Sequence, residues 1–170
     1  MPINSREKMH GAAIIRLFQH LGENLPAIKF SLKACVNRNG YVLSAILPKT
    51  LGKGKTVSCG LYLKVSSKRR TPWRYNFKKS HQEEILELKK NNMEVFTIFI
   101  NGDDGFACLN YEGLKEILDD DFEAQEWVSV SRKHNENYRV DGNDGTRLKK
   151  LARNVYPGVI IEYFNKELMI

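Results

Sequence analysis

Apolar and polar side chains alternate along residues 57–66, and this period of two predicts a β-strand with one buried face. The apolar positions are Val57, Cys59, Leu61, Leu63 and Val65. The intervening positions include Ser58, Tyr62, Lys64 and Ser66, which we expect on a face that is open to a polar partner. Residues 67–75 follow directly and mix cations with aromatic rings, so we expect the function of the protein to centre there.

The segments before this strand predict a helix and a β-hairpin. The helix begins at Ser5 as its cap, carries a broad apolar face and ends at Gly22. Two alternating runs then follow, residues 28–36 and 41–47, on either side of an Asn-Arg-Asn-Gly turn. Two such runs around an Asn-Gly turn are typical of a hairpin.

The segments after residue 79 predict helices in alternation with strands. Ser80 and Glu83 have the spacing of a capping box, which indicates that a helix starts there with His81 exposed in its first turn. The almost continuously apolar run 95–100 predicts a strand that is covered on both faces, and residues 106–109 form its hairpin partner.

The last third of the chain gives weaker signals. Residues 111–118 predict a short helix, and residues 127–130 and 138–140 predict strands. For residues 148–170 two interpretations remain open, an edge strand and a packed tail.

Together these elements predict an α/β (α+β) fold in a single domain, residues 1–170, with a central mixed β-sheet flanked by helices. No apolar run approaches the roughly 20 residues of a membrane span, and the first residues lack the apolar core of a signal peptide. We therefore expect a cytoplasmic protein without membrane contact. Cys35, Cys59 and Cys108 lie far apart without CxxC spacing, which predicts buried thiols rather than disulfides or zinc ligands.

Charge is segregated along the sequence. Thirteen Lys or Arg and no acid lie between Leu25 and Gln82, whereas residues 83–126 contain thirteen acids and only three lysines. Such a basic half would steer polyanions toward the protein. The alternative is that the two halves face each other in the fold and neutralise one another.

The basic aromatic segment suggests contacts to nucleic acid, because cations bind phosphate and flat rings stack on bases. The expected phosphate contacts are Lys64, Lys68, Arg69, Arg70, Arg74, Lys78 and Lys79. Trp73 and Tyr75 are expected to stack on an unpaired or flipped base. For Trp73 the alternative is a ring packed over the sheet, with Pro72 as a turn residue.

Several short motifs suggest nucleotide or metal sites but fit loops and turns better. The stretch 52–56, Gly-Lys-Gly-Lys-Thr, lacks the first glycine of a phosphate-binding loop and precedes a strand, so it predicts a basic hairpin loop. Asp103 and Asp104 fit a tight turn, and residues 119–121 fit a solvated loop. Residues 141–145 resemble part of a calcium loop but lack its terminal Glu, so we predict no metal site.

The expected order of elements, helix, three strands, helix and strand (αβββαβ), resembles the core of the restriction-endonuclease-like PD-(D/E)XK nucleases. The section from Leu61 to Leu118 is also similar to Holliday-junction resolvases. The similarity rests on a strand ending in Lys-x-x-x-Lys, a basic aromatic loop, a helix opening with His-Gln-Glu, an apolar strand and a helix near Tyr111. It covers about a third of the chain.

This resemblance implies a divalent metal held by acids on the second and third strands, the latter two residues before a lysine. Lys64 matches that lysine, but Tyr62 occupies the position of the acid. Because no acid occurs between Leu25 and Gln82, the usual metal site cannot form from this region.

Three functions therefore remain open. The first is a nucleic-acid-binding protein on a nuclease-like core, with DNA favoured over RNA and no cofactor. The second is a metal-dependent DNA endonuclease in which Glu7, Glu83 or Glu84 have taken over the metal-binding role beside Lys64, with Mg²⁺ as cofactor. The third is a protein-interaction or inhibitor module, of a mobile element or phage, that docks on an acidic partner. The positions of carboxylates around the Lys64 amine distinguish the first two.

Overall fold

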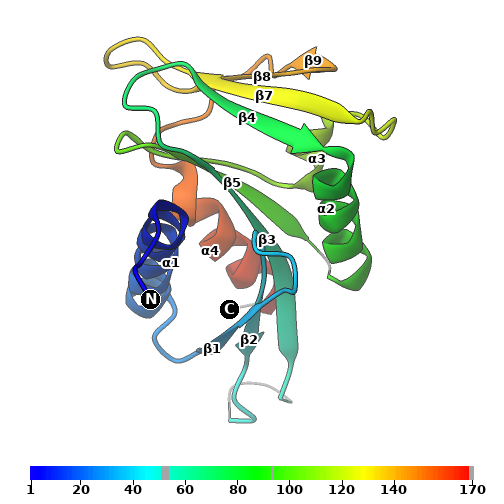
Figure 1. The fold of residues 1–170 in the computed structure, drawn as a ribbon. Helices are drawn as coiled ribbons and strands as arrows, with labels where there is room; N and C mark the ends of the chain where they lie inside the picture. The colour runs from blue at the N-terminus through cyan, green and yellow to red at the C-terminus, as the bar shows by residue number, and fades with distance from the viewer. Residues whose placement is uncertain (51–53, 93, 169–170) are drawn as a thin grey trace.

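Two β-sheets pack on each other in the computed structural model, which describes residues 1–50, 54–92 and 94–168 (Figure 1). The helices are α1 (Ser5–Asn24), α2 (Lys79–Asn91), α3 (Tyr111–Lys115) and α4 (Val155–Leu168). The larger sheet contains β1 (Lys29–Ala34), β2 (Gly40–Ile46), β3 (Thr56–Ser66), β5 (Val95–Asn101) and β6 (Gly105–Leu109). The smaller sheet contains β4 (Trp73–Lys78), β7 (Gln125–Ser131), β8 (Arg139–Gly142) and β9 (Gly145–Thr146).

The larger sheet is mixed, which confirms the predicted fold class. Its strand order is β1-β2-β3-β5-β6, with β3 and β5 parallel and the other neighbours antiparallel. The β1–β2 and β5–β6 hairpins are the two that the sequence predicted. The middle of the predicted basic loop, residues 51–53, lies outside the described residues.

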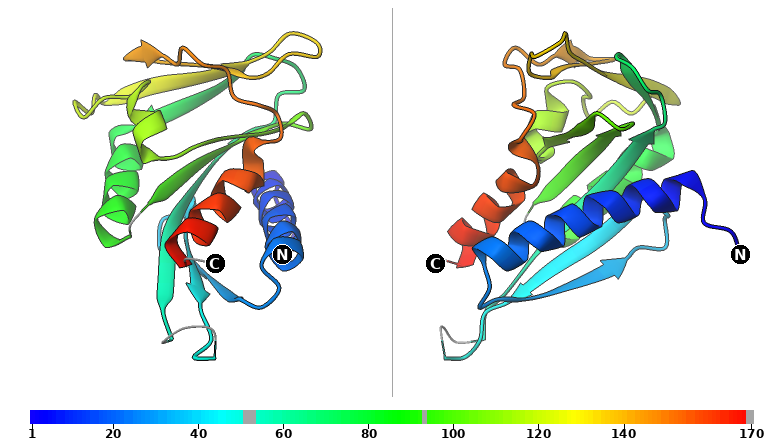
Figure 2. Two further views of the ribbon diagram at one scale, coloured as in Figure 1. Left: turned by 180° about the vertical axis from the view of Figure 1, so that it is seen from behind. Right: turned by 90° about the vertical axis from the view of Figure 1, so that its left-hand side faces the viewer.

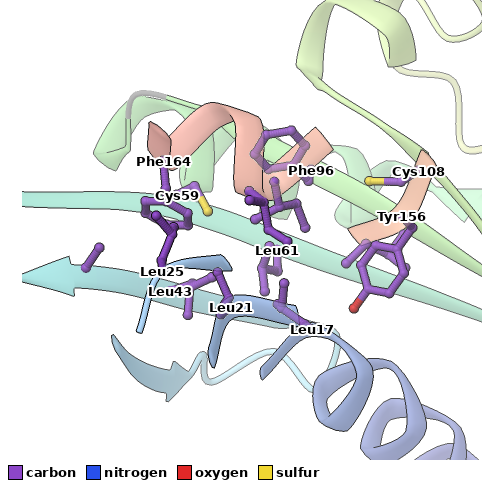
Figure 3. Packing of buried hydrophobic residues seen from close by; sticks show 14 of the residues in the cluster. Leu17, Leu21, Leu25, Leu43, Cys59, Leu61, Phe96, Cys108, Tyr156 and Phe164 are labelled. Atoms are coloured by element: carbon purple, nitrogen blue, oxygen red, sulfur yellow. The ribbon is translucent and has the colours of Figure 1, made fainter. Parts of the chain in front are cut away.

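Helices α1 and α4 lie side by side on one face of this sheet (Figure 2). Leu17 and Leu21 of α1 and Phe164 of α4 pack with Leu61 of β3 and Phe96 of β5 in one apolar core (Figure 3). The alternating apolar face of β3 that the sequence predicted is the face that enters this core.

The opposite face of β3 is also covered, which corrects the expectation of an open polar face. Tyr62 has no exposed surface and belongs to a second core with Phe99 of β5. Lys64 is only partly exposed. The residues that cover this face come from α2 and from the smaller sheet.

Strand β4 was not predicted. It begins at Trp73, inside the segment interpreted as a loop, and pairs antiparallel with β7. The αβββαβ order therefore contains one additional strand between β3 and α2. Trp73, Tyr75 and Phe77 all point inward from β4, and their rings fill the space between the two sheets.

Helix α4 replaces the edge strand or packed tail that remained open for residues 148–170. Ile160, Phe164 and Leu168 recur at intervals of four and are all buried, as expected for one face of a helix. Pro157 lies in its first turn, where the missing amide proton costs no intrahelical hydrogen bond.

Both predicted helix starts lie too late in the sequence, by one residue for α1 and by two residues for α2. Asn4, not Ser5, caps α1, because its side chain accepts a hydrogen bond from the Glu7 amide. Helix α2 starts at Lys79, so Ser80 does not cap it. The Lys78 amide donates to His81 Nδ1 at 3.2 Å, so this imidazole is partly buried instead of exposed.

The cysteines are free thiols, as predicted, and Cys59 and Cys108 are buried. Burial raises the pKa of both of these thiols, so they remain protonated and inert. Cys35 is partly exposed. Within the described ranges, no helix combines the length and the apolar character that a membrane span requires.

Gly142 of β8 allows the smaller sheet to approach the segment after α3. A Cβ atom at this position would lie 2.3 Å from the Ile117 carbonyl oxygen. We expect Gly142→Ala to lower the free energy of unfolding by about 2 kcal/mol, because either the strand or the Ile117 backbone must move. Urea denaturation measures this effect.

The matched control is Gly11→Ala in α1, where an added Cβ meets nothing within 4 Å. That substitution should stabilise the protein by about 0.5–1 kcal/mol, because alanine favours the helix. Equal unfolding midpoints for the two variants would contradict the close approach at Gly142.

Candidate nucleic-acid interface

The outer face of the smaller sheet carries polar and cationic side chains. Along β4 exposed and buried residues alternate, so Arg74, Asn76 and Lys78 point to solvent while the rings between them point inward. The cross-strand partner of Arg74 is Ser129, and that of Lys78 is Gln125. This face therefore presents hydrogen-bonding groups and positive charge.

Trp73 and Tyr75 do not reach this face, which corrects the prediction that they stack on a base. Each is only 2% exposed. The Trp73 indole donates to the Lys68 carbonyl oxygen at 2.9 Å, and the Tyr75 hydroxyl donates to the Ile100 carbonyl oxygen at 3.0 Å. Both polar groups are thus satisfied inside the protein, and the alternative of a Trp73 ring packed over the sheet is correct.

The exposed ring on the outer face is Trp127 of β7. It is 38% exposed, lies opposite Asn76 in the strand register, and has the Arg74 guanidinium carbon 5.9 Å from its ring centroid. Sequence reasoning missed its role, although a signal existed. Val128 and Val130 are apolar and buried, and Trp127 alternates with them along the strand. The period of two therefore places the Trp127 ring on the exposed side.

The loop between β3 and β4 adds further exposed cations at one end of this sheet. Lys68, Arg69 and Arg70 are all exposed, as predicted for phosphate contacts. Arg69 and Arg70 line a hollow of about 240 Å³ together with Arg132 and His134, which follow β7. The loops after β3 and β7 thus lie side by side at this end of the sheet (Figure 1).

Asp104 is the acid in this hollow, and it is already paired. Arg132 donates to both of its carboxylate oxygens, and the Tyr138 hydroxyl donates to Oδ2 at 2.6 Å. The hydrogen bonds from Arg132 lower the pKa of the Asp104 carboxyl, so it stays ionised. Asp104 therefore holds Arg132 in place through both of its carboxylate oxygens.

The acidic half of the chain does not neutralise the basic half. Among the described residues, no Lys or Arg between Leu25 and Gln82 forms an ion pair with a carboxylate. The ion pairs that form join acids to cations from residues 89–150, for example Lys115 to Asp120 and Arg147 to Glu116. Among the described residues, the charges of Arg74, Lys78 and the β3–β4 loop are therefore not paired with a carboxylate.

Lys64 lies inside the structure, between β3, β4 and α2. Its ammonium donates to the Asn76 carbonyl oxygen at 2.5 Å, lies 3.1 Å from His81 Nδ1, and is 4.6 Å from the Phe77 ring centroid. Burial lowers the pKa of Lys64 to about 8, although the charge of Glu84 opposes this shift. Because protein groups hold this ammonium, it differs from the exposed phosphate contacts that the sequence predicted.

The predicted acids do not gather around Lys64. Of these acids, Glu84 is the one whose charge acts on Lys64, where it raises the pKa. Its carboxylate accepts a hydrogen bond from the Tyr62 hydroxyl. Glu83 is exposed, and both residues line a hollow of about 530 Å³ between α2 and the β1–β2 turn. Glu7 is held in the capping box of α1, where its carboxylate accepts from the Asn4 amide at 2.8 Å.

A metal site of the nuclease type is therefore not assembled from these acids. Within the described part of the chain, Glu7, Glu83 and Glu84 do not belong to any group of three side chains placed to hold a metal ion. Lys79, at the start of α2, is exposed and extends the row of cations from Lys78.

No protein-family model matches the chain, and no curated protein or solved structure is significantly similar to it.

The position of Lys64 predicts a specific pH dependence of stability. Its ammonium titrates near pH 10.5 in the unfolded chain and near pH 8 in the folded protein. Between these values the unfolded chain binds more protons, so stability rises with pH. Relative to Lys64→Met, the wild type should gain about 2 kcal/mol of unfolding free energy from pH 7.5 to pH 10.5, measured by urea denaturation.

The buried tyrosines also contribute to the pH dependence of stability. Comparison with Lys64→Met removes this contribution, because both proteins share these tyrosines. Lys29→Met, at an exposed position of β1, shows the effect of losing a surface cation. If the difference in unfolding free energy between wild type and Lys64→Met does not change with pH, the Lys64 ammonium is solvated in the folded protein.

Proposed function

We propose that the protein binds nucleic acid through the outer face of the smaller sheet and the adjoining β3–β4 loop, and that it does so without hydrolysing it. The observation that carries this proposal is an exposed ring, Trp127, on an open antiparallel sheet that is bordered by cations without ion-pair partners among the described residues. We call this surface the β4–β7 face, made of the exposed residues Arg74, Asn76, Lys78, Gln125 and Trp127.

The chemistry of the β4–β7 face suits a single strand or an unpaired base. An aromatic ring gives each stacked base about 1–3 kcal/mol with little regard to sequence. Asn76 lies directly opposite Trp127 and offers donors and an acceptor to the edge of a stacked base. Arg74 and Lys78 lie on the same face of β4, where they meet the phosphates on either side of that base.

The β3–β4 loop supplies the largest share of the electrostatic attraction. Lys68, Arg69 and Arg70 are adjacent in sequence and all exposed, and the hollow beside them contains Arg132. A phosphate backbone that crosses Trp127 and continues past this loop meets positive charge along its path. Such contacts release counterions, so binding should depend steeply on salt.

The nuclease-like core remains part of the proposal. The position of Lys64 on β3, with α2 and then the apolar strand β5 following, supports it, because the resemblance to the PD-(D/E)XK enzymes rests partly on these features. Hydrolysis is not proposed, because the Lys64 ammonium contacts the Asn76 carbonyl oxygen and His81, and because among the described residues Glu84 does not belong to a group placed to hold a metal ion. A phosphodiester needs an activated water and charge neutralisation, which a metal usually supplies.

Replacing the loop cations tests the electrostatic part. The variant Lys68→Ser/Arg69→Ser/Arg70→Ser should bind a fluorescent 20-nucleotide single-stranded DNA more weakly, and its salt dependence should be less steep. Each lost phosphate contact lowers the slope of log K against log [salt] by about 0.7. Fluorescence anisotropy between 50 and 200 mM salt gives both quantities.

The matched control is Lys29→Ser/Lys33→Ser/Arg38→Ser, which removes the same charge from exposed positions on and after β1. It should keep nearly wild-type binding. Equal losses in both variants would show that net charge alone attracts DNA, and wild-type binding that is unchanged between the two salt concentrations would reject the proposal.

Replacing Trp127 tests the stacking part. Trp127→Ala should weaken binding of single-stranded DNA by roughly 5- to 150-fold, which corresponds to the loss of one stacked base. Trp127→Phe should recover most of the affinity, and duplex DNA should be affected less because its bases are already stacked. Anisotropy titrations measure all three.

Two further ligands decide between alternative partners. We propose DNA over RNA, so an RNA of the same sequence should bind less tightly than the DNA. Poly-glutamate of equal charge should compete poorly, because it has no base to stack. Equal competition by poly-glutamate, with no effect of Trp127→Ala, would instead favour an acidic protein partner.

A further inference from the structure

Three acids from separate segments meet at the edge of the smaller sheet. Asp119 follows α3, Glu126 belongs to β7, and Asp144 lies in the turn between β8 and β9. One carboxylate oxygen of each lies within 4.8 Å of those of the other two. Sequence reasoning interpreted residues 119–121 as a solvated loop and residues 141–145 as a turn, and it gave Glu126 no role.

Glu126 is the unusual member of this cluster. It lies on the inner side of β7, opposite Phe77, and only 1% of its surface is exposed. Gln82 of α2, itself buried, donates a hydrogen bond to Oε2. The other oxygen, Oε1, is buried without any hydrogen-bond partner. A buried carboxylate oxygen in this state is costly unless an ion or a proton compensates it.

No protein cation provides that compensation among the described residues. Asp119, Glu126 and Asp144 form no ion pair, although two cations are nearby in the fold. Lys115 is paired with Asp120 at 3.1 Å, and Arg147 is paired with Glu116 at 3.3 Å. Three carboxyl groups therefore converge, while Lys115 and Arg147 are paired with other acids.

We propose that Asp119, Glu126 and Asp144 bind a hard divalent cation, Ca²⁺ or Mg²⁺. Carboxylate oxygens are the ligands that these ions prefer, and three of them from three segments supply a compact all-oxygen set. The absence of sulfur and imidazole from the group argues against zinc and copper. Two of the acids are exposed, which leaves room for water to complete the coordination.

The cation would connect three segments of the chain that already lie close together at this edge. Through Glu126 and Gln82 it is linked to α2, through Asp119 to the segment after α3, and through Asp144 to the β8–β9 turn. The Asp144 carboxylate also accepts a hydrogen bond from the Asp119 amide at 2.9 Å, so these two segments are already aligned. Binding of the cation would stabilise the edge of the smaller sheet, and this effect does not depend on nucleic-acid binding.

Calorimetric titration of chelator-treated protein with CaCl₂ and with MgCl₂ tests the proposal. We expect one cation per chain, with a dissociation constant below about 1 mM for the preferred ion. The midpoint of thermal unfolding should rise with the concentration of that ion, because the cation binds the folded state only. The two titrations decide which of the two ions is preferred.

Two variants and one control assign the site. Asp144→Asn and Glu126→Gln should each weaken binding at least tenfold and abolish the rise in unfolding midpoint. Without added cation, Glu126→Gln should unfold at or above the wild-type midpoint, because it removes a buried charge and keeps the shape of the side chain. Asp121→Asn removes the same charge from an exposed acid outside the cluster and should bind as wild type does.

Absence of saturable binding by wild type up to 10 mM of either ion would overturn the proposal and leave a proton as the compensating charge on Glu126. Wild-type affinity in Asp144→Asn and Glu126→Gln would also overturn it, since the cation would then bind elsewhere. If Asp121→Asn weakened cation binding as much as Asp144→Asn does, the binding would reflect general negative surface charge and the proposed site would be wrong.

Discussion

The layer of aromatic rings between the two sheets determines what the rest of the molecule can present to solvent. Phe99 of the larger sheet lies edge-on to Tyr75 and near Phe77, with centroids 5.0 and 6.1 Å apart, and Trp73 meets Tyr138 at 6.2 Å. Such pairs contribute about 0.5–1.5 kcal/mol each beyond the area that they bury. Since side chains alternate along a strand, drawing these rings inward forces Arg74, Asn76 and Lys78 outward.

The same layer explains why some of the fold could be predicted from the sequence and some could not. The strand around Leu61, the apolar strand β5 and both hairpins have unambiguous periodicity, and the structure confirms them. In β4 the period of two was equally present in Trp73, Tyr75 and Phe77. The dense positive charge around these rings suggested a binding loop instead, and the cross-strand partner, β7, lies about fifty residues later in the sequence.

The sequence predicted the exposure of the loop cations correctly and the exposure of the aromatic rings wrongly. Lys68, Arg69 and Arg70 are exposed as expected, because a run of adjacent cations has no way to bury itself. Whether an aromatic ring is exposed depends on which face of its strand is covered, and that is a tertiary property. Trp127 and Trp73 lie on opposite faces of one sheet, so the ring of Trp127 is exposed and that of Trp73 is buried.

The segregation of charge along the sequence is kept in the ion pairs of the described residues. The acids after residue 82 that form ion pairs do so with cations from residues 89–150, as Asp120 does with Lys115 and Asp104 does with Arg132. The group formed by Asp119, Glu126 and Asp144 is an exception, because its members come together without a cation from the described residues. Proximity of these acids could not be read from the sequence, since it arises where α3, β7 and the β8–β9 turn converge.

The most direct test of this account uses the two tryptophan indoles as reporters, because one lies in the aromatic layer and the other on the outer face. In a ¹H–¹⁵N NMR titration with a short single-stranded DNA, the indole signal of Trp127 should shift in a saturable manner. The indole signal of Trp73, which donates to Lys68 inside the protein, should move much less. A Trp127 signal that stays unchanged at saturating DNA, or a larger shift for Trp73, would contradict the account.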